Sequence, residues 1–309
     1  MYKSVILFFQ VLIMFLVFSC SSNDNKVIDE TSTDKKDPLF ELTDSIIIDK
    51  PDVSKEIISE LMTTVPKPIE ILVNLKENGG LYSPELLLNT ENIQKYSSAF
   101  QMAFVLGVYK ADFTYININN DKTSVTNYLN KVTDVSDKMD VGSFFDNSVM
   151  NRFKTNIEKT DSLHFITEQT FEKINDYLKK NNHISVNVLI NCGSWIESMY
   201  LATNTKKIEN KKAVYSRIGE QQVALDNVIF LLSVFSKEPN FKSLLNDLME
   251  ISKEFEKVKI TYSYAKPTIK EVDGRLEITD NSSSSVELSD ELYKSIGLKI
   301  KNIREKLVK

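Results

Sequence analysis

Two polar residues, Asp112 and Gln221, fall on the apolar faces of the helices that the sequence predicts around them. Asp112 lies inside the apolar arc of a helix predicted over about 92–116, in which Lys110 marks the narrow solvent-facing side. Gln221 lies on the apolar stripe of a helix predicted over about 212–236. Because an isolated carboxylate is costly to bury, we expect a buried polar network around these two residues.

The side chains that we expect to join Asp112 to Gln221 are Tyr109, Tyr115 and Arg217. Two interpretations of such a network stay open at this point. In the first, the network is structural and fixes the register of the helices. In the second, its polar groups orient a ligand in a pocket between helices whose lining is otherwise apolar.

A third possibility is an envelope hydrolase that uses carboxylates for acid and base catalysis. Its candidates are Asp112 and Glu197, although Glu197 lies near the border of its helix's apolar face and is expected to be solvated. Glycoside hydrolysis needs two carboxyl groups roughly 5–10 Å apart in an open cleft. We keep the hydrolase as an alternative and assign no residue a catalytic role.

The motifs of several large enzyme classes are missing from the sequence. It has no P-loop, no dinucleotide-binding motif and no nucleophile elbow. Its two histidines, His164 and His183, stand outside the usual metal-ligand spacings, and Cys192 falls on a predicted buried helix face. We therefore expect no metal and no cofactor, and the sequence favours a protein without enzymatic activity.

Low glycine content and long stretches without proline favour a helical protein. The predicted helices cover about 51–62, 68–77, 92–116, 122–139, 148–158, 161–181, 184–203, 212–236, 240–258 and 289–307. Short connections favour antiparallel packing of successive helices. We expect a mainly α fold, either a multi-helix antiparallel bundle or stacked helical hairpins, with a small C-terminal β-hairpin.

The predicted hairpin covers about 267–279, with Asp273-Gly274 as its turn. The preceding stretch 259–264 is also rich in β-branched and aromatic residues, whereas the serines of 282–285 are expected to form a flexible spacer. Together with the helices, this gives one domain over residues 39–309.

The first residues have the pattern of a secretory signal. Lys3 precedes an apolar run over 5–18, which is shorter than the ~20 residues that a membrane-spanning helix needs. The sequence VFSC at 17–20 resembles the lipobox of bacterial lipoproteins. This resemblance implies that residues 1–19 are a lipoprotein signal peptide and that Cys20 carries the lipid. An uncleaved N-terminal membrane anchor is the alternative.

Residues 20–38 contain few apolar side chains, so we expect a flexible tether between the lipid on Cys20 and the domain. Ser21 follows the cysteine where lipoproteins of the inner membrane often carry Asp. The resemblance therefore implies an outer-membrane lipoprotein of the cell envelope, on the periplasmic face or at the cell surface.

Three segments also resemble one family. NIQKYSSAFQMAFVLGVYKADFTY (92–115), NVLINCGSWIESMYLA (187–202) and YSRIGEQQVALDNVIFLL (215–232) are similar to uncharacterised helical lipoproteins from Bacteroidota. The resemblance covers about residues 66–258. It implies a helical, lipid-anchored protein and supplies no catalytic residues.

The charge of the chain limits the kinds of partner that we expect, and its cysteine content limits the disulfides. The formal charge is −5, and removal of residues 1–19 with their single lysine would make it −6. Because Lys and Glu are interspersed, the sequence predicts no nucleic-acid binding. With Cys20 lipidated, Cys192 would be the one remaining thiol, so we expect no intramolecular disulfide. The sequence favours a membrane-anchored module that binds an envelope protein or a small-molecule ligand, and it leaves the oligomeric state open.

Overall fold

The computed structural model describes residues 39–50, 52–91, 93–272, 275–279 and 281–309. Its short helices are η1 (Phe40–Leu42), α2 (Asp44–Ile47), η2 (Pro84–Leu86), η3 (Ile93–Lys95) and η4 (Gly142–Phe145). Its longer helices are α3 (Lys55–Thr63), α4 (Pro68–Glu77), α5 (Ala99–Ile118), α6 (Lys122–Lys138), α7 (Asn147–Thr155), α8 (Thr160–Lys180), α9 (Ile184–Asn204), α10 (Lys211–Gly219), α11 (Gln221–Val234), α12 (Pro239–Phe255) and α13 (Asp290–Val308). The predicted mainly α fold is confirmed.

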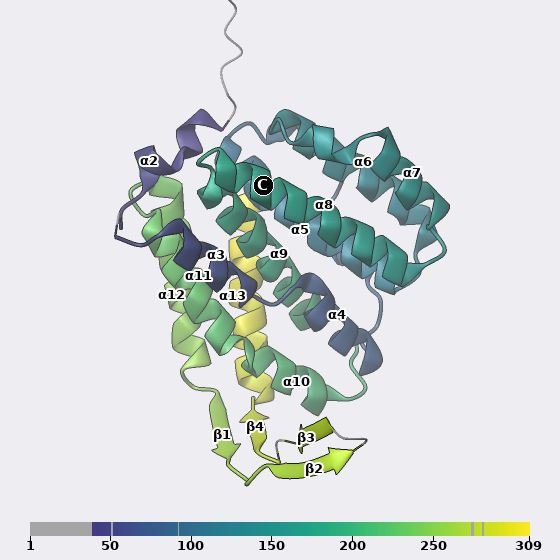
Figure 1. Ribbon diagram of the computed structural model, residues 1–309, viewed down its shortest axis with the longest axis vertical. Helices are drawn as coiled ribbons and strands as arrows, with labels where there is room; N and C mark the ends of the chain where they lie inside the picture. The colour runs from purple at the N-terminus through teal and green to yellow at the C-terminus, as the bar shows by residue number, and fades with distance from the viewer. Residues whose placement is uncertain (1–38, 51, 92, 273–274, 280) are drawn as a thin grey trace, which may run out of the picture. The chain divides into compact units, whose positions relative to one another are not determined.

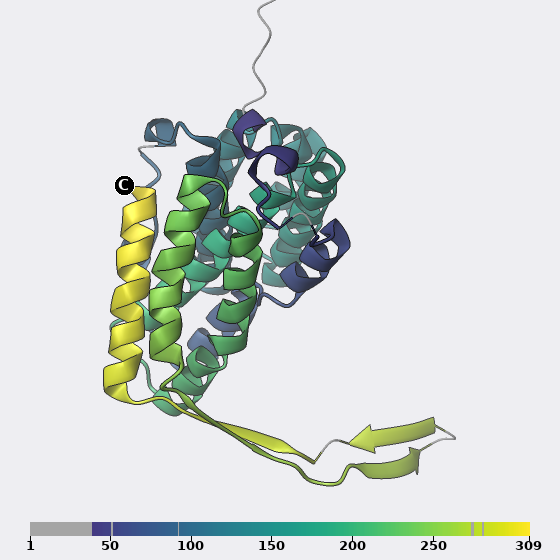
Figure 2. The ribbon, with the colours of Figure 1, turned by 90° about the vertical axis from the view of Figure 1, so that its left-hand side faces the viewer.

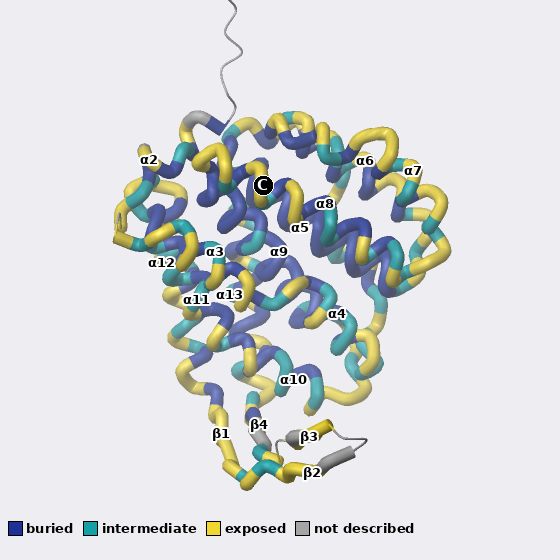
Figure 3. The backbone as a smooth tube through the Cα atoms, in the orientation of Figure 1, coloured by how far each residue is buried: buried dark blue, intermediate teal, exposed yellow. Residues whose placement is uncertain are grey.

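Helices α5 and α9 form the centre of the domain (Figures 1 and 3). Within α5 every residue except Gln101 is buried, and α9 is similarly enclosed. The two backbones approach so closely that a Cβ atom on Gly107 would lie 2.0 Å from the carbonyl oxygen of Ile190. A Cβ atom on Gly193 would lie 2.2 Å from the carbonyl oxygen of Phe104. Glycine at both positions is therefore a requirement of this crossing.

The remaining helices are amphipathic and surround this central pair. Helix α6 packs on α5, α4 lies against both central helices, and α13 contacts α9 and α12. The buried residues of α12 recur every three or four positions, as its one apolar face requires: Phe241, Leu244, Leu248, Ile251 and Phe255. The central helices have no solvent-facing side, whereas the outer ones do.

Two long helices differ from the prediction, one in its start and one in its continuity. The helix predicted over 92–116 begins at Ala99, where the Ser98 Oγ accepts the Gln101 N–H at 3.2 Å and caps the first turn. The helix predicted over 212–236 is divided at Glu220 into α10 and α11. The other long helices lie close to their predicted bounds.

Four strands lie between α12 and α13, namely β1 (Lys259–Ser263), β2 (Thr268–Val272), β3 (Arg275–Thr279) and β4 (Ser283–Glu287). Strands β2 and β3 form the predicted antiparallel hairpin. The expectation of a spacer over 282–285 is wrong, because residues 283–285 pair with β1 within β4. Backbone hydrogen bonds to β1 can order a serine-rich segment, because the ladder uses main-chain groups that every serine carries.

The strands lead away from the helices (Figure 2). At their base, Val286 of β4 is buried against α10, where its Cγ1 lies 2.4 Å from the place of a Cβ atom on Gly219. Farther out the side chains are solvated, and Tyr262 and Leu276 are 64% and 71% exposed.

The predicted signal peptide, Cys20 and the tether fall within 1–38 and lie outside the described residues. Within the part of the chain that the structure describes, no helix combines the length and the apolar character needed to cross a bilayer.

Candidate functional site

A buried charge cluster joins three helices around Asp112. Arg304 of α13 donates two hydrogen bonds to Glu197 of α9, from Nε to Oε2 at 2.8 Å and from Nη2 to Oε1 at 2.9 Å. Asp112 of α5 accepts the Leu88 N–H on Oδ2 at 2.9 Å. Both carboxyl groups are completely buried. The guanidinium also stacks on Tyr200, 4.5 Å from the ring centroid.

Asp112 is the carboxyl group of this cluster whose surroundings favour the protonated form. Burial raises the pKa of Asp112 well above its usual range, and the neighbouring Glu197 carboxylate raises this pKa further, although Arg304 opposes both effects. The Asp112 Oδ1 atom receives no hydrogen bond from a neighbouring donor. A proton on Oδ1 would give this oxygen a hydrogen bond to donate, with the neighbouring Glu197 carboxylate as the acceptor. The cluster then holds one negative and one positive charge.

The cluster corrects the expectation that Glu197 is solvated. Helix α9 is enclosed by its neighbours, so a residue at the border of its apolar face meets another helix instead of water. Arg304 provides the counter-charge that makes this burial tolerable. The Asp112 and Glu197 carboxyls line neither of the cavities described below. The hydrolase alternative, which needs them in an open cleft, therefore gains no support from the geometry.

Gln221 is buried in a separate group. Its Oε1 accepts the Trp195 Nε1–H at 3.1 Å, and its Nε2 donates to the Arg217 carbonyl oxygen at 3.1 Å. Among the hydrogen bonds of the described residues, none joins Gln221 to Asp112. The side chains expected to join them have other partners. The Tyr109 hydroxyl donates to the Asn89 carbonyl oxygen at 3.3 Å.

The Tyr115 hydroxyl accepts the Ser83 N–H at 3.1 Å and faces the Leu81 carbonyl oxygen at 3.3 Å. It thereby anchors the segment before η2 to α5 and shares no hydrogen-bond partner with Gln221. The structure thus replaces the single expected network by separate hydrogen-bonded groups, each of which fastens one helix to its neighbours.

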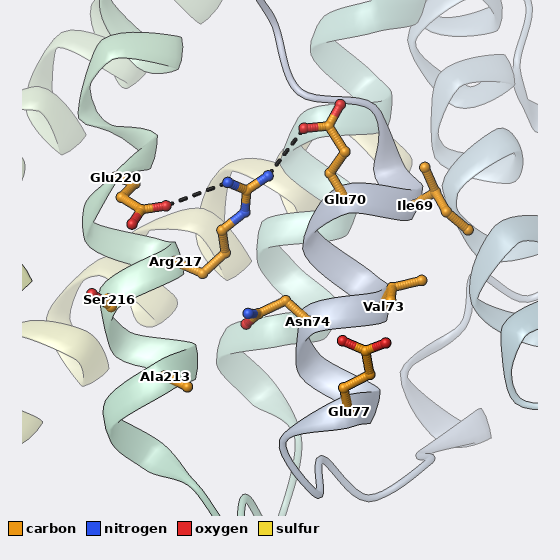
Figure 4. A pocket seen from close by; sticks show the side chains of 9 residues that line it. All are labelled: Ile69, Glu70, Val73, Asn74, Glu77, Ala213, Ser216, Arg217 and Glu220. Atoms are coloured by element: carbon orange, nitrogen blue, oxygen red, sulfur yellow. Dashed lines mark hydrogen bonds and ion pairs between the residues drawn. The ribbon is translucent and has the colours of Figure 1, made fainter. Parts of the chain in front are cut away.

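The Arg217 side chain lies in a surface groove between α4 and α10 (Figure 4). Its Nη2 is 3.0 Å from Glu70 Oε2, and its Nη1 is 3.3 Å from Glu220 Oε2. The groove has a volume of about 470 Å³ and is lined by Ile69, Glu70, Val73, Asn74, Glu77, Ala213, Ser216, Arg217 and Glu220. The two carboxylates that pair with Arg217, those of Glu70 and Glu220, are solvated, so these ion pairs hold Arg217 only weakly.

A second cavity, which we name the Lys110 cavity, lies between the α3–α4 connection and helices α5, α8 and α9. Its volume is about 250 Å³. The polar part of its wall comprises Ser59, Thr63, Lys67, Lys110, Glu168, Glu172, Asn175, Asn187, Asn191 and Ser194. The rest of its wall comprises Met62, Val65, Pro66, Pro68, Phe171 and Ile190. Apolar surface with a few fixed polar groups is typical of small-molecule sites.

Two lysines share one carboxylate in this cavity. The Lys110 Nζ is 3.0 Å from Glu168 Oε1 and 4.8 Å from the centroid of the Phe171 ring. The Lys67 Nζ is 3.2 Å from Glu168 Oε2. Burial by itself would raise the pKa of Glu168, but the two lysines and their hydrogen bonds outweigh it and lower this pKa. Glu168 is therefore ionised.

Lys110 corrects a second expectation, since it does not mark a solvent-facing side of α5. The residue is only 7% exposed, because α8 covers this side of α5 and brings Glu168 to the ammonium group. The cavity was not predicted because Lys110 was taken to face solvent. The sequence did contain one indication of it, because Lys110 is the single lysine in a helix of 20 residues that is otherwise almost entirely apolar or uncharged.

The asparagines of the cavity wall form several hydrogen bonds, but one of their polar atoms forms none. The Asn187 Nδ2 donates to the Asn175 carbonyl oxygen at 3.1 Å, and the Asn191 Nδ2 donates to the Asn187 carbonyl oxygen at 2.9 Å. The Asn175 Oδ1 atom is buried and receives no hydrogen bond. This oxygen is closed to a water-sized probe, so it is an unsatisfied acceptor within the packing of the wall and does not face the free space of the cavity.

No protein-family model, no curated protein and no solved structure matches this chain. The choice of a candidate site therefore depends on geometry. Within the part of the chain that the structure describes, no group of three or more His, Cys, Asp or Glu side chains is placed to hold a metal ion. Burial raises the pKa of the Cys192 thiol, which keeps it protonated inside α9.

Of the three polar sites, the Lys110 cavity has the features of a binding site. The Asp112 cluster is sealed, and the Arg217 groove is an open surface with solvated charges. The Lys110 cavity alone among these three combines a buried cation with partly apolar walls. It is the candidate functional site of this protein.

Proposed function

We propose that this chain is a lipid-anchored protein of the bacterial cell envelope that binds a small ligand in the Lys110 cavity without transforming it. The observation that carries the binding role is the buried Lys110–Glu168 pair in the wall of a partly apolar cavity. Fixed polar groups of this kind orient a ligand, while the apolar walls supply contact area.

The cavity is poorly equipped for catalysis. The residues that line it include no histidine and no cysteine. Its three hydroxyl groups donate to backbone carbonyl oxygens: Ser59 to Lys55 at 2.7 Å, Thr63 to Glu60 at 2.7 Å, and Ser194 to Gly107 at 2.9 Å. A serine or threonine nucleophile needs an adjacent base, and none of these hydroxyls has one as its partner. These contacts support a non-enzymatic binding protein.

The anchoring part of the proposal is supported by the sequence of residues 1–38. The signal-like run, the lipobox-like VFSC and the polar tether favour a lipid on Cys20, and Ser21 favours the outer membrane. The resemblance to helical lipoproteins of Bacteroidota agrees with this location. Two or three acyl chains, each methylene contributing ~0.8 kcal/mol, would hold the protein firmly on a membrane.

Metabolic labelling tests the anchor. Cells that express the wild-type chain or Cys20→Ala are grown with labelled palmitate, and the protein is recovered from the membrane fraction. We expect label on the wild type and none on Cys20→Ala. Unlabelled wild-type protein, or equal label on both chains, would show that Cys20 is not the lipid attachment site.

Thermal unfolding tests the binding role. The mature protein, solubilised with its lipid, is heated with and without a filtered small-molecule extract of the producing cells' envelope. We expect the extract to raise the melting temperature of the wild type and of Lys306→Met, but not that of Lys110→Met. Lys306 is a matched control because it pairs with Asp247 at 2.6 Å on the exposed surface. An unchanged wild-type melting temperature would contradict the proposal.

A further inference from the structure

We infer that the free edge of strand β1 is an interaction surface that pairs with the same strand of a second copy of this chain. In such a dimer the two β1 strands run antiparallel and join two β1–β4 ladders into one four-stranded sheet. This inference concerns a different part of the molecule from the Lys110 cavity, so it does not rest on ligand binding. It follows from the exposure, the charge and the sequence symmetry of β1.

Strand β1 has one paired edge and one free edge. Its five residues pair with β4, from Lys259 opposite Glu287 to Ser263 opposite Ser283. In the described ranges of the chain, no other strand pairs with its second edge. All five residues are exposed, and the strand leads away from the helices (Figure 2). The backbone groups on the second edge are therefore open to pairing with a strand from another chain.

The sequence of β1 lacks the features that usually protect a strand edge. Proteins block such edges with charged side chains or proline. Residues 260–265 (ITYSYA) contain neither. In contrast, β2 carries Lys270 and Glu271, and β3 carries Arg275 and Glu277. Of these three strands, β1 has the edge that is best suited to pairing.

Large apolar side chains of β1 and of the residue after it are left in solvent. Ile260 and Tyr262 share one face of the strand, because successive side chains of a strand point to opposite faces, and they are 46% and 64% exposed. Tyr264 directly follows the strand and is 71% exposed. Single apolar residues are common on protein surfaces, but three within five positions form a patch of the kind that marks an interaction site.

The symmetry of the β1 sequence favours a second copy as the partner. A two-fold axis at Thr261 places this residue opposite its own counterpart, and it places Ile260 of each copy opposite Tyr262 of the other. A β-branched side chain opposite an aromatic ring is a favourable cross-strand pair. The only charged residue of the strand, Lys259, then faces the uncharged Ser263. All five residues of β1 thus pair without placing like charges opposite each other.

Strand β3 offers a second symmetric register, which is less favourable. An axis at Leu276 places Arg275 of each copy opposite Glu277 of the other. Both of these charged residues are exposed, so their pairing contributes little. We therefore assign the contact to β1 and use Leu276 as a control position.

The area of the contact indicates a reversible dimer. An aromatic side chain offers ~150–250 Å² of surface, so the exposed parts of Tyr262 and Tyr264 each amount to roughly 100–180 Å². The four tyrosines of two copies then supply at most roughly 400–700 Å², to which Ile260 and the backbone add. Stable interfaces bury ~1,200–2,000 Å² in total, and smaller ones belong to transient complexes. We expect a dimer that forms and dissociates with protein concentration.

Disulfide cross-linking tests the register. Paired residues of antiparallel strands have Cα atoms ~4.5–5.5 Å apart, a distance that a disulfide can span. Oxidation of Thr261→Cys in envelope membranes should therefore give a reducible dimer of twice the mass of the chain. Ser285→Cys is the matched control, because Ser285 is exposed and pairs with Thr261 from β4. Its two copies would lie about 14 Å apart, three strand spacings, which is too far for a disulfide.

A charged side chain on β1 tests the surface independently of the register. The mature protein, solubilised with its lipid, is analysed by sedimentation over a series of concentrations. Tyr262→Lys should raise the dissociation constant of the dimer by at least about tenfold, because a charge replaces an aromatic ring at the paired edge. Leu276→Lys places the same charge on β3, at a residue that is 71% exposed, and should dimerise as the wild type does. Since both positions are exposed, we expect both variants to keep the wild-type melting temperature.

The combined outcomes decide the inference. A reducible dimer of Thr261→Cys, together with weaker association of Tyr262→Lys, supports it. A wild type that stays monomeric at every concentration would overturn it, and so would equal cross-linking of Thr261→Cys and Ser285→Cys. Loss of the dimer in Leu276→Lys alone would assign the contact to β3, and a cross-linked band of another mass would identify a different protein as the partner. Each of these two results also overturns the inference, and neither affects the ligand-binding role proposed above.

Discussion

Asp112→Asn and Glu197→Gln make the same chemical change at neighbouring buried carboxyl groups, and we expect opposite effects on the free energy of unfolding. The raised pKa of Asp112 favours its protonated form in the folded chain, and its Oδ2 accepts the Leu88 N–H. An asparagine reproduces this pattern, with its oxygen facing Leu88 and its amide donating toward Glu197. Glu197 is the ionised partner of Arg304, so its replacement removes a charge that the buried guanidinium needs.

The sign of the pH dependence follows from the raised pKa of Asp112. In the unfolded chain this carboxyl group loses its proton near its ordinary value of 3.8, whereas the folded chain retains the proton to higher pH. Between these two pKa values the unfolded state binds fewer protons than the folded state. The contribution of the Asp112 proton to the free energy of unfolding is therefore full below pH 3.8, and it is lost as the pH rises toward the pKa of the folded chain. One proton gives a slope of about 1.4 kcal/mol per pH unit. Asp112→Asn has no such slope.

At pH 7 Asp112→Asn should therefore be at least as stable as the wild type, and its advantage should grow as the pH rises from 4. Breaking a buried ion pair by removing one partner costs ~3–5 kcal/mol. In Glu197→Gln part of this cost is offset, because Asp112 can ionise and face Arg304. The double variant removes both carboxyl groups and should show the full ~3–5 kcal/mol loss, more than the sum of the single changes.

Urea unfolding at several pH values between 4 and 8 provides the assay. The single tryptophan, Trp195, is completely buried, so its fluorescence reports the exposure of the central helices. The expected order of stability at pH 7 is Asp112→Asn, Glu197→Gln and then the double variant. Equal destabilisation by Asp112→Asn and Glu197→Gln, with no change across pH, would refute the assignment of the proton to Asp112.

Two further substitutions test the packing around α9. Gly107→Ala should lower the free energy of unfolding by about 1–3 kcal/mol or more, because its Cβ would meet the Ile190 carbonyl oxygen at 2.0 Å, and an unchanged urea midpoint would show that the crossing tolerates a methyl group. Gln221→Leu should cost about 1–3 kcal/mol and alter Trp195 emission, because the indole N–H loses its acceptor. Gln221→Glu keeps an acceptor for that N–H, so equal emission changes in both variants would contradict this assignment.

The helical fold could be predicted from the sequence because its outer helices have regular apolar faces. Helix α12 shows the pattern clearly, since five buried residues follow the three- and four-residue spacing of one face. The ends of the helices were harder to predict than the helices themselves. Ser98 caps α5, so the helix begins at Ala99, seven residues after the predicted start at 92.

The polar sites could not be predicted as well, because they depend on residues that are distant in the chain. Periodicity placed Asp112 on an apolar face, but nothing local indicates that Arg304 meets Glu197 across 107 positions. The same limit explains Lys110, which looks solvated until α8 brings Glu168 against it. The apolar periodicity of a sequence describes one helix at a time. Whether a charged side chain can be buried depends instead on the partner that another helix supplies.

The contacts of α13 link the packing of the domain's centre to this helix. This helix brings Arg304 to Glu197, and the carbonyl oxygen of Val308 accepts a hydrogen bond from the Tyr96 hydroxyl at 2.9 Å. A chain from which α13 is removed would contain α5 and α9 but leave the Glu197 carboxylate without its counter-ion. Because such an uncompensated buried charge is costly, we expect the centre to pack stably only when α13 is present.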